Sequence, residues 1–189
     1  MTNSDDKLYY SILASGSSGN ATYLETAHHR ILIDAGLSGK RLEERMEAIG
    51  RSLKDVEALF VTHEHSDHVQ GVGVLARRYG MDVYANAKTW QAMAKKVGQI
   101  PLAQKNIIEP GKVKDFGDLE VESFAVSHDA ACPQFYQMHH DNQTFCILTD
   151  TGYVSQRVAK TIENADAYLM ECNHDTEMLR MGPYSWPLK

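Results

Sequence analysis

One short stretch constrains the fold of this chain more than any other: Leu59-Phe60-Val61-Thr62-His63-Glu64-His65-Ser66-Asp67-His68. Its apolar beginning has the length and the β-branched and aromatic content of a buried strand. Three histidines and an aspartate follow within six residues. Helical patterning resumes at Val69, so we expect the polar cluster to occupy the loop between a strand and a helix. The first turn of that helix, which is expected to end at Gly80, would direct free amides toward the cluster.

The cluster has the composition of a metal site. Neutral imidazoles and a carboxylate at such close spacing are the ligands that zinc, manganese or iron prefers. His63 and His65 can reach one ion from an extended loop, whereas Asp67 and His68 can serve a second ion. A helical zinc-protease motif is excluded, because its second histidine would fall at the position of Asp67. A solvated polar loop is the less favoured alternative, since four such groups rarely crowd together without a metal.

Other predicted strands also end in polar side chains. Asp34, His128, Asp150 and Glu171 each follow an apolar run. Two sheets whose rims meet at one edge, with helices outside, would bring these strand ends to the histidine cluster. His128 would then complete a three-nitrogen face, with a satisfied buried histidine as the alternative, and Asp150 could bridge two ions. Asp34 either begins its turn or accepts a hydrogen bond from a metal-bound histidine and fixes its tautomer.

Glycine and serine fill the segment after the first predicted strand, Ala14-Ser15-Gly16-Ser17-Ser18-Gly19-Asn20. It resembles a phosphate-binding loop, but it lacks the Gly-Lys-Ser/Thr ending of a nucleotide-binding loop. A hairpin between two strands is the favoured interpretation. Contact with a substrate is the alternative, and Ser17 and Asn20 are the candidates for that contact.

Four of the remaining histidines fall in predicted turns. His28 and His29 lie between strands expected at 21–26 and 30–33, and His139 and His140 lie between strands expected near 135–138 and 144–148. We interpret both segments as solvated turns. Residues 99–109 are interpreted as connecting chain.

Composition is that of an ordinary globular protein, with 189 residues, of which 43% are hydrophobic and 23% charged. We expect a single domain over residues 1–189. No apolar run reaches the length of a membrane span, and three cysteines without zinc-knuckle spacing indicate reduced thiols in a cytoplasmic protein. A net charge of −6 argues against a broad basic surface for duplex nucleic acid.

Taken together, the motifs resemble those of a known family. The string from Thr62 to His68, with the strand ends at Asp34, His128 and Asp150, resembles the metallo-β-lactamase superfamily. Residues 13–20 and 171–175 narrow the resemblance to the bacterial YycJ/WalJ family of single-strand-active 5′-to-3′ DNA exonucleases. The resemblance implies an α+β fold, a four-layer αββα sandwich, of which this chain lacks the C-terminal segment.

The resemblance also implies a site for two divalent ions, zinc or manganese, whose residues carry over one by one. The first ion would be bound by His63, His65 and His128, the second by Asp67 and His68, with Asp150 bridging and Asp34 supporting the histidines from outside. The catalytic candidates are Asp67, Asp150 and His174, and the substrate-binding candidates are Ser17, Asn20 and Asn173. The superfamily usually supplies a further histidine to the second ion downstream of where this chain stops, so we expect that ion to be weak or absent.

Three functional hypotheses follow from these residues and from the resemblance: the residues support a hydrolytic site for two ions, and the resemblance implies nuclease activity. The leading one is hydrolysis of phosphodiester bonds in single-stranded DNA by a hydroxide that bridges two metal ions. The second is hydrolysis of a small thioester, lactone or cyclic phosphodiester. The third belongs to another class, a metal-binding or regulatory fragment without turnover. No membrane partner is expected, and the sequence leaves the oligomeric state open.

Overall fold

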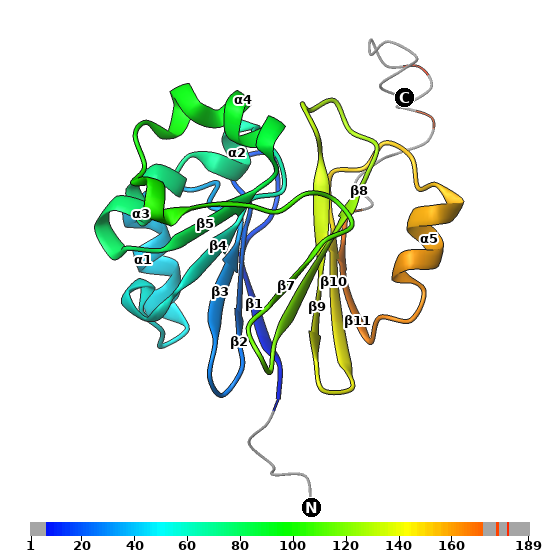
Figure 1. The fold of residues 1–189 in the computed structure, drawn as a ribbon, viewed down its shortest axis with the longest axis horizontal. Coiled ribbons are helices and arrows are strands. Elements are labelled where there is room, and N and C mark those ends of the chain that lie inside the picture. The colour runs from blue at the N-terminus through cyan, green and yellow to red at the C-terminus, as the bar shows by residue number, and fades with distance from the viewer. Residues whose placement is uncertain (1–6, 172–176, 178–180, 182–189) are drawn as a thin grey trace, which may run out of the picture.

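Two β-sheets lie face to face in the computed structural model, which describes residues 7–171 together with residues 177 and 181. Figure 1 shows helices on the outer face of each sheet, so the chain forms four layers. This arrangement is the αββα sandwich that the sequence predicts. Among the helices in the described part of the chain, none is long and apolar enough to cross a membrane. Asn173 and His174 lie outside the described residues.

The first sheet has six strands in the order β1-β2-β3-β4-β5-β6. Their bounds are β1 Tyr9–Ala14, β2 Ala21–Glu25, β3 Arg30–Ile33, β4 Ala58–Phe60, β5 Asp82–Ala85 and β6 Lys105–Ile107. The prediction of connecting chain over 99–109 is therefore wrong at β6. The pairs from β3 to β6 are parallel, and Ile33 pairs with Phe60. Asp34 and the histidine cluster consequently leave the sheet at the same edge, because the carboxyl ends of parallel strands coincide.

The second sheet has five strands in the order β11-β10-β9-β8-β7. Their bounds are β7 Val113–Asp115, β8 Glu120–Ala125, β9 Gln134–His140, β10 Gln143–Leu148 and β11 Ala167–Met170. All neighbours are antiparallel except β10 and β11. Strand β9 continues through His139 and His140, so these residues are paired with β10 and are not in a solvated turn as predicted.

Five α-helices complete the described layers. Their bounds are α1 Gly39–Ala48, α2 Ser66–Val69, α3 Val72–Tyr79, α4 Ala87–Val97 and α5 Gln156–Ile162. Figure 1 shows α1, α3 and α4 outside the first sheet and α5 outside the second. Ser38 and Asn86 cap α1 and α4, since their side chains accept hydrogen bonds from backbone amides in the first turn of each helix.

The helix predicted to run from Val69 is divided into α2 and α3. Its break lies at Gly71, whose amide donates to the carbonyl oxygen of Ala35 at 2.7 Å. A Cβ at this position would lie 2.5 Å from the carbonyl oxygen of Leu37, so only glycine fits here. Asp67 and His68 are consequently held in the short helix α2 and do not lie in a loop as predicted.

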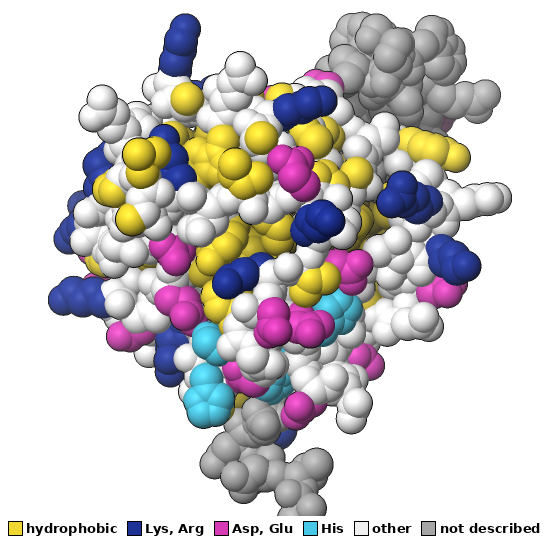
Figure 2. Space-filling view, viewed as in Figure 1, with side chains coloured by type: hydrophobic (Ala, Val, Ile, Leu, Met, Phe, Trp, Pro, Cys, Tyr) yellow, Lys and Arg dark blue, Asp and Glu magenta, His cyan; other side chains and the backbone are white. Residues whose placement is uncertain are grey.

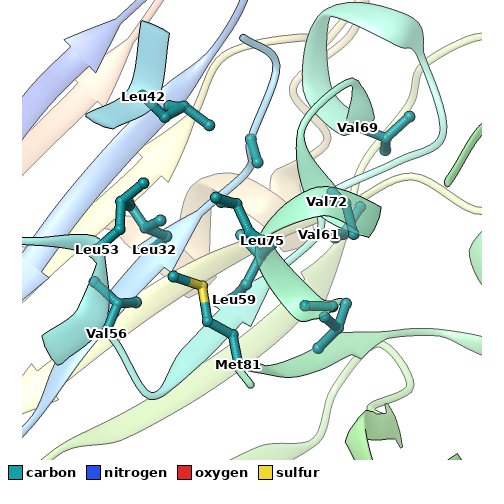
Figure 3. Close-up of a cluster of buried hydrophobic side chains, with 14 of the residues drawn as sticks. Leu32, Leu42, Leu53, Val56, Leu59, Val61, Val69, Val72, Leu75 and Met81 are labelled. Carbon is teal, nitrogen blue, oxygen red and sulfur yellow. The ribbon is translucent and has the colours of Figure 1, made fainter. Parts of the chain in front are cut away.

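Successive side chains of β4 point to opposite faces of the first sheet, and they contribute to two separate hydrophobic cores. Leu59 faces the helices, where it packs with residues of α1 and α3 such as Leu42 and Leu75 (Figure 3). Phe60 faces the second sheet and stacks on Tyr84 with ring centroids 4.6 Å apart. Each fully buried side chain of this size contributes roughly 1.5–3 kcal/mol of transfer free energy. The site edge is thereby anchored on both faces of β4.

Candidate metal centre

Asp34 organises the edge of the first sheet from a strained backbone position. It is a buried non-glycine residue with a φ of 61°, and its amide donates to the carbonyl oxygen of Phe60 at 2.8 Å. Its Oδ1 accepts from the amide of Thr62, and its Oδ2 accepts from the Thr62 hydroxyl, both at 2.8 Å. Left-handed backbone at such a residue costs roughly 1–3 kcal/mol and persists only where surrounding contacts fix it. The carboxylate thus holds Thr62, the residue directly before the histidine cluster, in place.

The same carboxylate orients His68. Its Oδ2 lies 2.8 Å from Nδ1 of His68, and both side chains are buried. A carboxylate only accepts hydrogen bonds, so His68 carries a proton on Nδ1 and directs Nε2 into the site. Burial lowers the pKa of His68, but the negative charges of Asp34 and Asp150 outweigh burial and raise the pKa to about 10. His68 is therefore prepared for a cation or a second proton at Nε2.

Thr62 links the Asp34 carboxylate to His63 and thereby fixes which nitrogen of that ring carries the proton. The threonine hydroxyl gives its proton to Asp34, so it accepts from Nδ1 of His63, 3.0 Å away. Nε2 of His63 is buried and has no hydrogen-bond partner in the described part of the chain. Burial, followed by the charges of His68 and His128, holds the pKa of His63 far below its ordinary value. A buried, unprotonated and unpartnered imidazole nitrogen is what a metal ligand requires, so this site fits a metal ion.

Two groups of ligand atoms converge around His63. The nitrogens of His63, His65 and His128 all lie within 4.8 Å of one another, and Nε2 of His128 is 3.3 Å from Nδ1 of His65. Ligand atoms of His63, His68 and Asp150 lie within the same limit. The structure therefore places the three predicted first-ion histidines together, and it places Asp150 beside the first and last histidines of the cluster.

Asp67 lies slightly farther from the second group. Its Oδ2 is 3.6 Å from Nε2 of His68, whereas Oδ2 of Asp150 is 3.1 Å away. Burial raises the pKa of Asp150, but its hydrogen bond to His68 and the charge of that ring lower the pKa well below the usual range. Burial and the charge of Asp150 raise the pKa of Glu171. Several carboxylates thus share one small space, which a divalent ion would neutralise.

The two described substrate-binding candidates have different environments. Asn20 is only 8% exposed, and its Nδ2 lies 3.0 Å from Nε2 of His68 and 3.4 Å from Oδ2 of Asp67. It therefore touches the predicted ligands themselves. Ser17 is exposed and lines an open hollow of which Asp67 forms another wall.

Thr62 is the functional residue whose role the sequence did not suggest. Its position is a usable signal, because a hydroxyl between a buried strand and the first histidine can relay an aspartate to the ring. Glu64 was likewise given no role, although its Oε1 accepts from the amide of Ala131 at 2.8 Å and connects the cluster to the loop after His128. That contact spans distant parts of the chain and leaves no local pattern.

Known proteins are similar in sequence to this chain over most of its length. Residues 29–186 match the family model of the beta-lactamase superfamily domain. The chain is 59% identical over 182 residues to exodeoxyribonuclease WalJ of Streptococcus pneumoniae (serotype 2, strain D39), covering 95% of this chain and 68% of that protein. It is 54% identical over 182 residues to exodeoxyribonuclease YycJ of Bacillus anthracis, covering 96% of this chain and 69% of that protein.

Solved structures extend the agreement to the fold. Rm3 metallo-beta-lactamase has a TM-score of 0.67 at 17% identity, over 86% of this chain and 74% of that chain. Such a low identity supports the fold alone. The family model and the two exodeoxyribonucleases, each more than half identical to this sequence, show more: the chain belongs to the beta-lactamase superfamily.

Proposed function

We propose that this chain is a metal-dependent DNA exonuclease that acts on single strands in the cytoplasm, with residues 1–189 forming one domain. One observation carries the proposal: two converging ligand groups share His63 in a chain that is 59% identical to an exodeoxyribonuclease. The net charge of −6 favours single strands over duplex DNA, which presents a denser array of phosphates. Cys132 and Cys146 are both unpaired, which suits a reducing compartment.

The donor set fits divalent ions, and zinc and manganese are both compatible with imidazole and carboxylate ligands. We assign His63, His65 and His128 to the first ion, and Asp67 and His68 to a second ion, with Asp150 between them. When bound, such ions polarise a phosphodiester and lower the pKa of water.

The protein's own groups prepare the site for that chemistry. Asp34 holds the Nδ1 proton of His68 directly, and it holds that of His63 through Thr62. Nε2 of His63 therefore faces the site unprotonated, whereas the raised pKa of His68 keeps a second proton on its Nε2, which a bound metal ion would displace. Asp67 and Asp150 supply the negative charge that retains cations beside an anionic substrate. His174 remains a proposed catalytic residue on sequence grounds alone.

A digestion experiment tests the proposal. A 3′-fluorescein-labelled single-stranded oligonucleotide is incubated with the protein and either zinc or manganese, beside a blunt hairpin and a circular single strand. We expect shortening of the linear strand, slower digestion of the hairpin, an intact circle and complete inhibition by a chelator. An intact linear strand, together with hydrolysis of a panel of thioesters, lactones or cyclic phosphodiesters, would refute exonuclease function.

A further inference from the structure

A hollow of about 370 Å³ opens beside the second ligand group, and its role follows from the residues that line it. They include Ser17, Ser18, Gly36, Asp67, Gln70 and Lys96. We call this space the Lys96 hollow. Its volume lies at the small end of the range for ligand pockets, about 300–1,000 Å³. Because the predicted ligand Asp67 forms part of its wall, anything bound there lies next to the proposed metal ions.

The turn that carries Ser17 and Ser18 is tied to Asp67 by backbone hydrogen bonding. The amide of Asn20 donates to the carbonyl oxygen of Asp67 at 2.7 Å, and the Asn20 side chain accepts from the amide of Gly16 at 2.9 Å. The intervening turn presents Ser17 and Ser18 outward, and neither hydroxyl forms a hydrogen bond within the described residues. Two free hydroxyl groups are thus held at a set distance from the site.

The wall of the hollow also includes Lys96, in the last turn of α4. Its Nζ donates to the carbonyl oxygen of Glu64 at 2.8 Å, so the ammonium is held by the histidine cluster itself. An ammonium group has three donors, and two remain for another partner. Among the described residues that line the hollow, Lys96 is the only basic one, and none of them is aromatic.

We propose that the Lys96 hollow binds a phosphate of the DNA strand adjacent to the phosphodiester that is cleaved, with Lys96 and the two serine hydroxyls as donors. This inference rests on the proposed function. Hydroxyl and ammonium donors suit phosphate oxygens, whereas binding of a base would require an aromatic platform. A local cation is needed here, since Asp67, Asp150 and the net charge of −6 all repel the strand.

The test compares two neighbouring lysines of α4. Lys96→Gln removes the charge but keeps a donor for the Glu64 carbonyl, Lys96→Arg keeps the charge, and Lys95→Gln is the control because Lys95 is exposed and does not line the hollow. The readouts are kcat and KM on a linear single strand, metal content, and the Kd of a fluorescein-labelled single strand, measured with a chelator present at several salt concentrations.

For Lys96→Gln we expect KM and Kd to rise about tenfold with kcat and metal content nearly unchanged. The slope of log Kd against log salt should fall by about 0.7, as for one lost phosphate contact on a single strand. Lys96→Arg should restore most of the affinity, and Lys95→Gln should behave as wild type.

Two results would overturn the inference. Equal Kd values and salt slopes for Lys96→Gln and Lys95→Gln would show that no phosphate binds in the hollow, and the exonuclease proposal would stand if the wild type still digests DNA. A fall in kcat and metal content with an unchanged salt slope would show that Lys96 only secures the Glu64 carbonyl. If the wild type digests nothing, the exonuclease proposal fails, and the binding measurement still decides on the hollow.

Discussion

Histidines gather at both ends of the sandwich, and their ring nitrogens meet different partners at the two ends. The upper end in Figure 1, near α2, holds His63, His65, His68 and His128. The opposite end holds the turn with His28 and His29 and the end of β9 with His139 and His140. Figure 2 shows histidine and acidic side chains side by side at that lower end.

At the lower end, ring nitrogens face oxygen acceptors. Nδ1 of His29 lies 2.8 Å from a carboxylate oxygen of Glu57, and its Nε2 lies 3.0 Å from one of Asp118. Nδ1 of His140 donates to the carbonyl oxygen of Asp118 at 2.6 Å. At the upper end, by contrast, Nε2 of His63 has no partner among the described residues. Clustering of histidines is therefore a weaker sign of a metal site than a buried, convergent ring nitrogen that has no acceptor, as Nε2 of His63.

The strongest test of this comparison removes one histidine from each end. His65→Ala should lower metal affinity by more than about 100-fold and abolish DNA digestion, because loss of an outer supporting group alone costs about 10–100-fold. His139→Ala is the matched control and should keep its metal. Both variants are assayed by metal analysis and by digestion of a single strand. Wild-type turnover in His65→Ala would refute the proposed metal centre. Loss of an ion in His139→Ala would show that the lower end also binds metal, which would contradict the comparison.

The next prediction concerns the group that orders the upper end. Asp34→Asn keeps the size of the side chain, and asparagine tolerates the positive φ. Its amide group, however, would place a hydrogen-bond donor at the position of Oδ2, which in the wild type accepts from His68 and Thr62. His68 should then lose its fixed tautomer, and metal affinity should fall about 10–100-fold with little loss of folding. Competition with a chromophoric chelator measures the affinity, and thermal unfolding provides the control. An unchanged affinity would show that Asp34 serves the backbone only.

Local sequence patterns were sufficient for most of the framework. The bounds of β3 and the positions of the polar strand ends follow from short apolar runs and their neighbours. Ile49 shows the limit of periodicity: it would continue the buried face of Leu42 and Met46, but α1 ends at Ala48 and Ile49 is 37% exposed. Hydrophobic period predicts a face only while the helix continues.

Features that depend on contacts between distant segments could not be predicted in this way. His140 is 1% exposed because the turn at Asp118 covers it, and Lys96 reaches the carbonyl of Glu64 only because α4 packs on α2. Gly71 divides a helix because the chain near Ala35 approaches it. In the site, the ligand candidates came from local spacing, whereas the relay through Thr62 required the strand carrying Asp34 to lie alongside.

A pH experiment on the metal-free protein should distinguish the two ends by stability. Burial lowers the pKa of His63 and His128, so both stay neutral in the folded state while the unfolded chain protonates them below about pH 6.5. The free energy of unfolding should therefore decrease as pH falls below that value, by up to about 1.4 kcal/mol per pH unit for each ring. His68, with its pKa raised to about 10, acts oppositely: its stabilisation is complete below about pH 6.5 and is lost as pH rises toward 10.

Urea unfolding with a chelator present measures this dependence. His63→Asn should flatten the acidic slope, whereas His28→Asn should not alter it, because His28 is exposed at the lower end. An identical slope in wild type and His63→Asn would show that the convergent histidines do not govern acid stability.

The smallest expected effects lie within the lower end. His140→Ala should lower the free energy of unfolding by about 1–3 kcal/mol, since it removes a buried ring and leaves the Asp118 carbonyl without its donor. His28→Ala should change it by less than about 0.5 kcal/mol. Neither variant should lose metal or digest DNA more slowly, because neither ring belongs to the converging ligand groups of the upper end. A change of metal content in His140→Ala at unchanged stability would mean that the lower end influences metal binding at the upper end. That result would contradict the expectation that histidines paired with oxygen acceptors serve the fold alone.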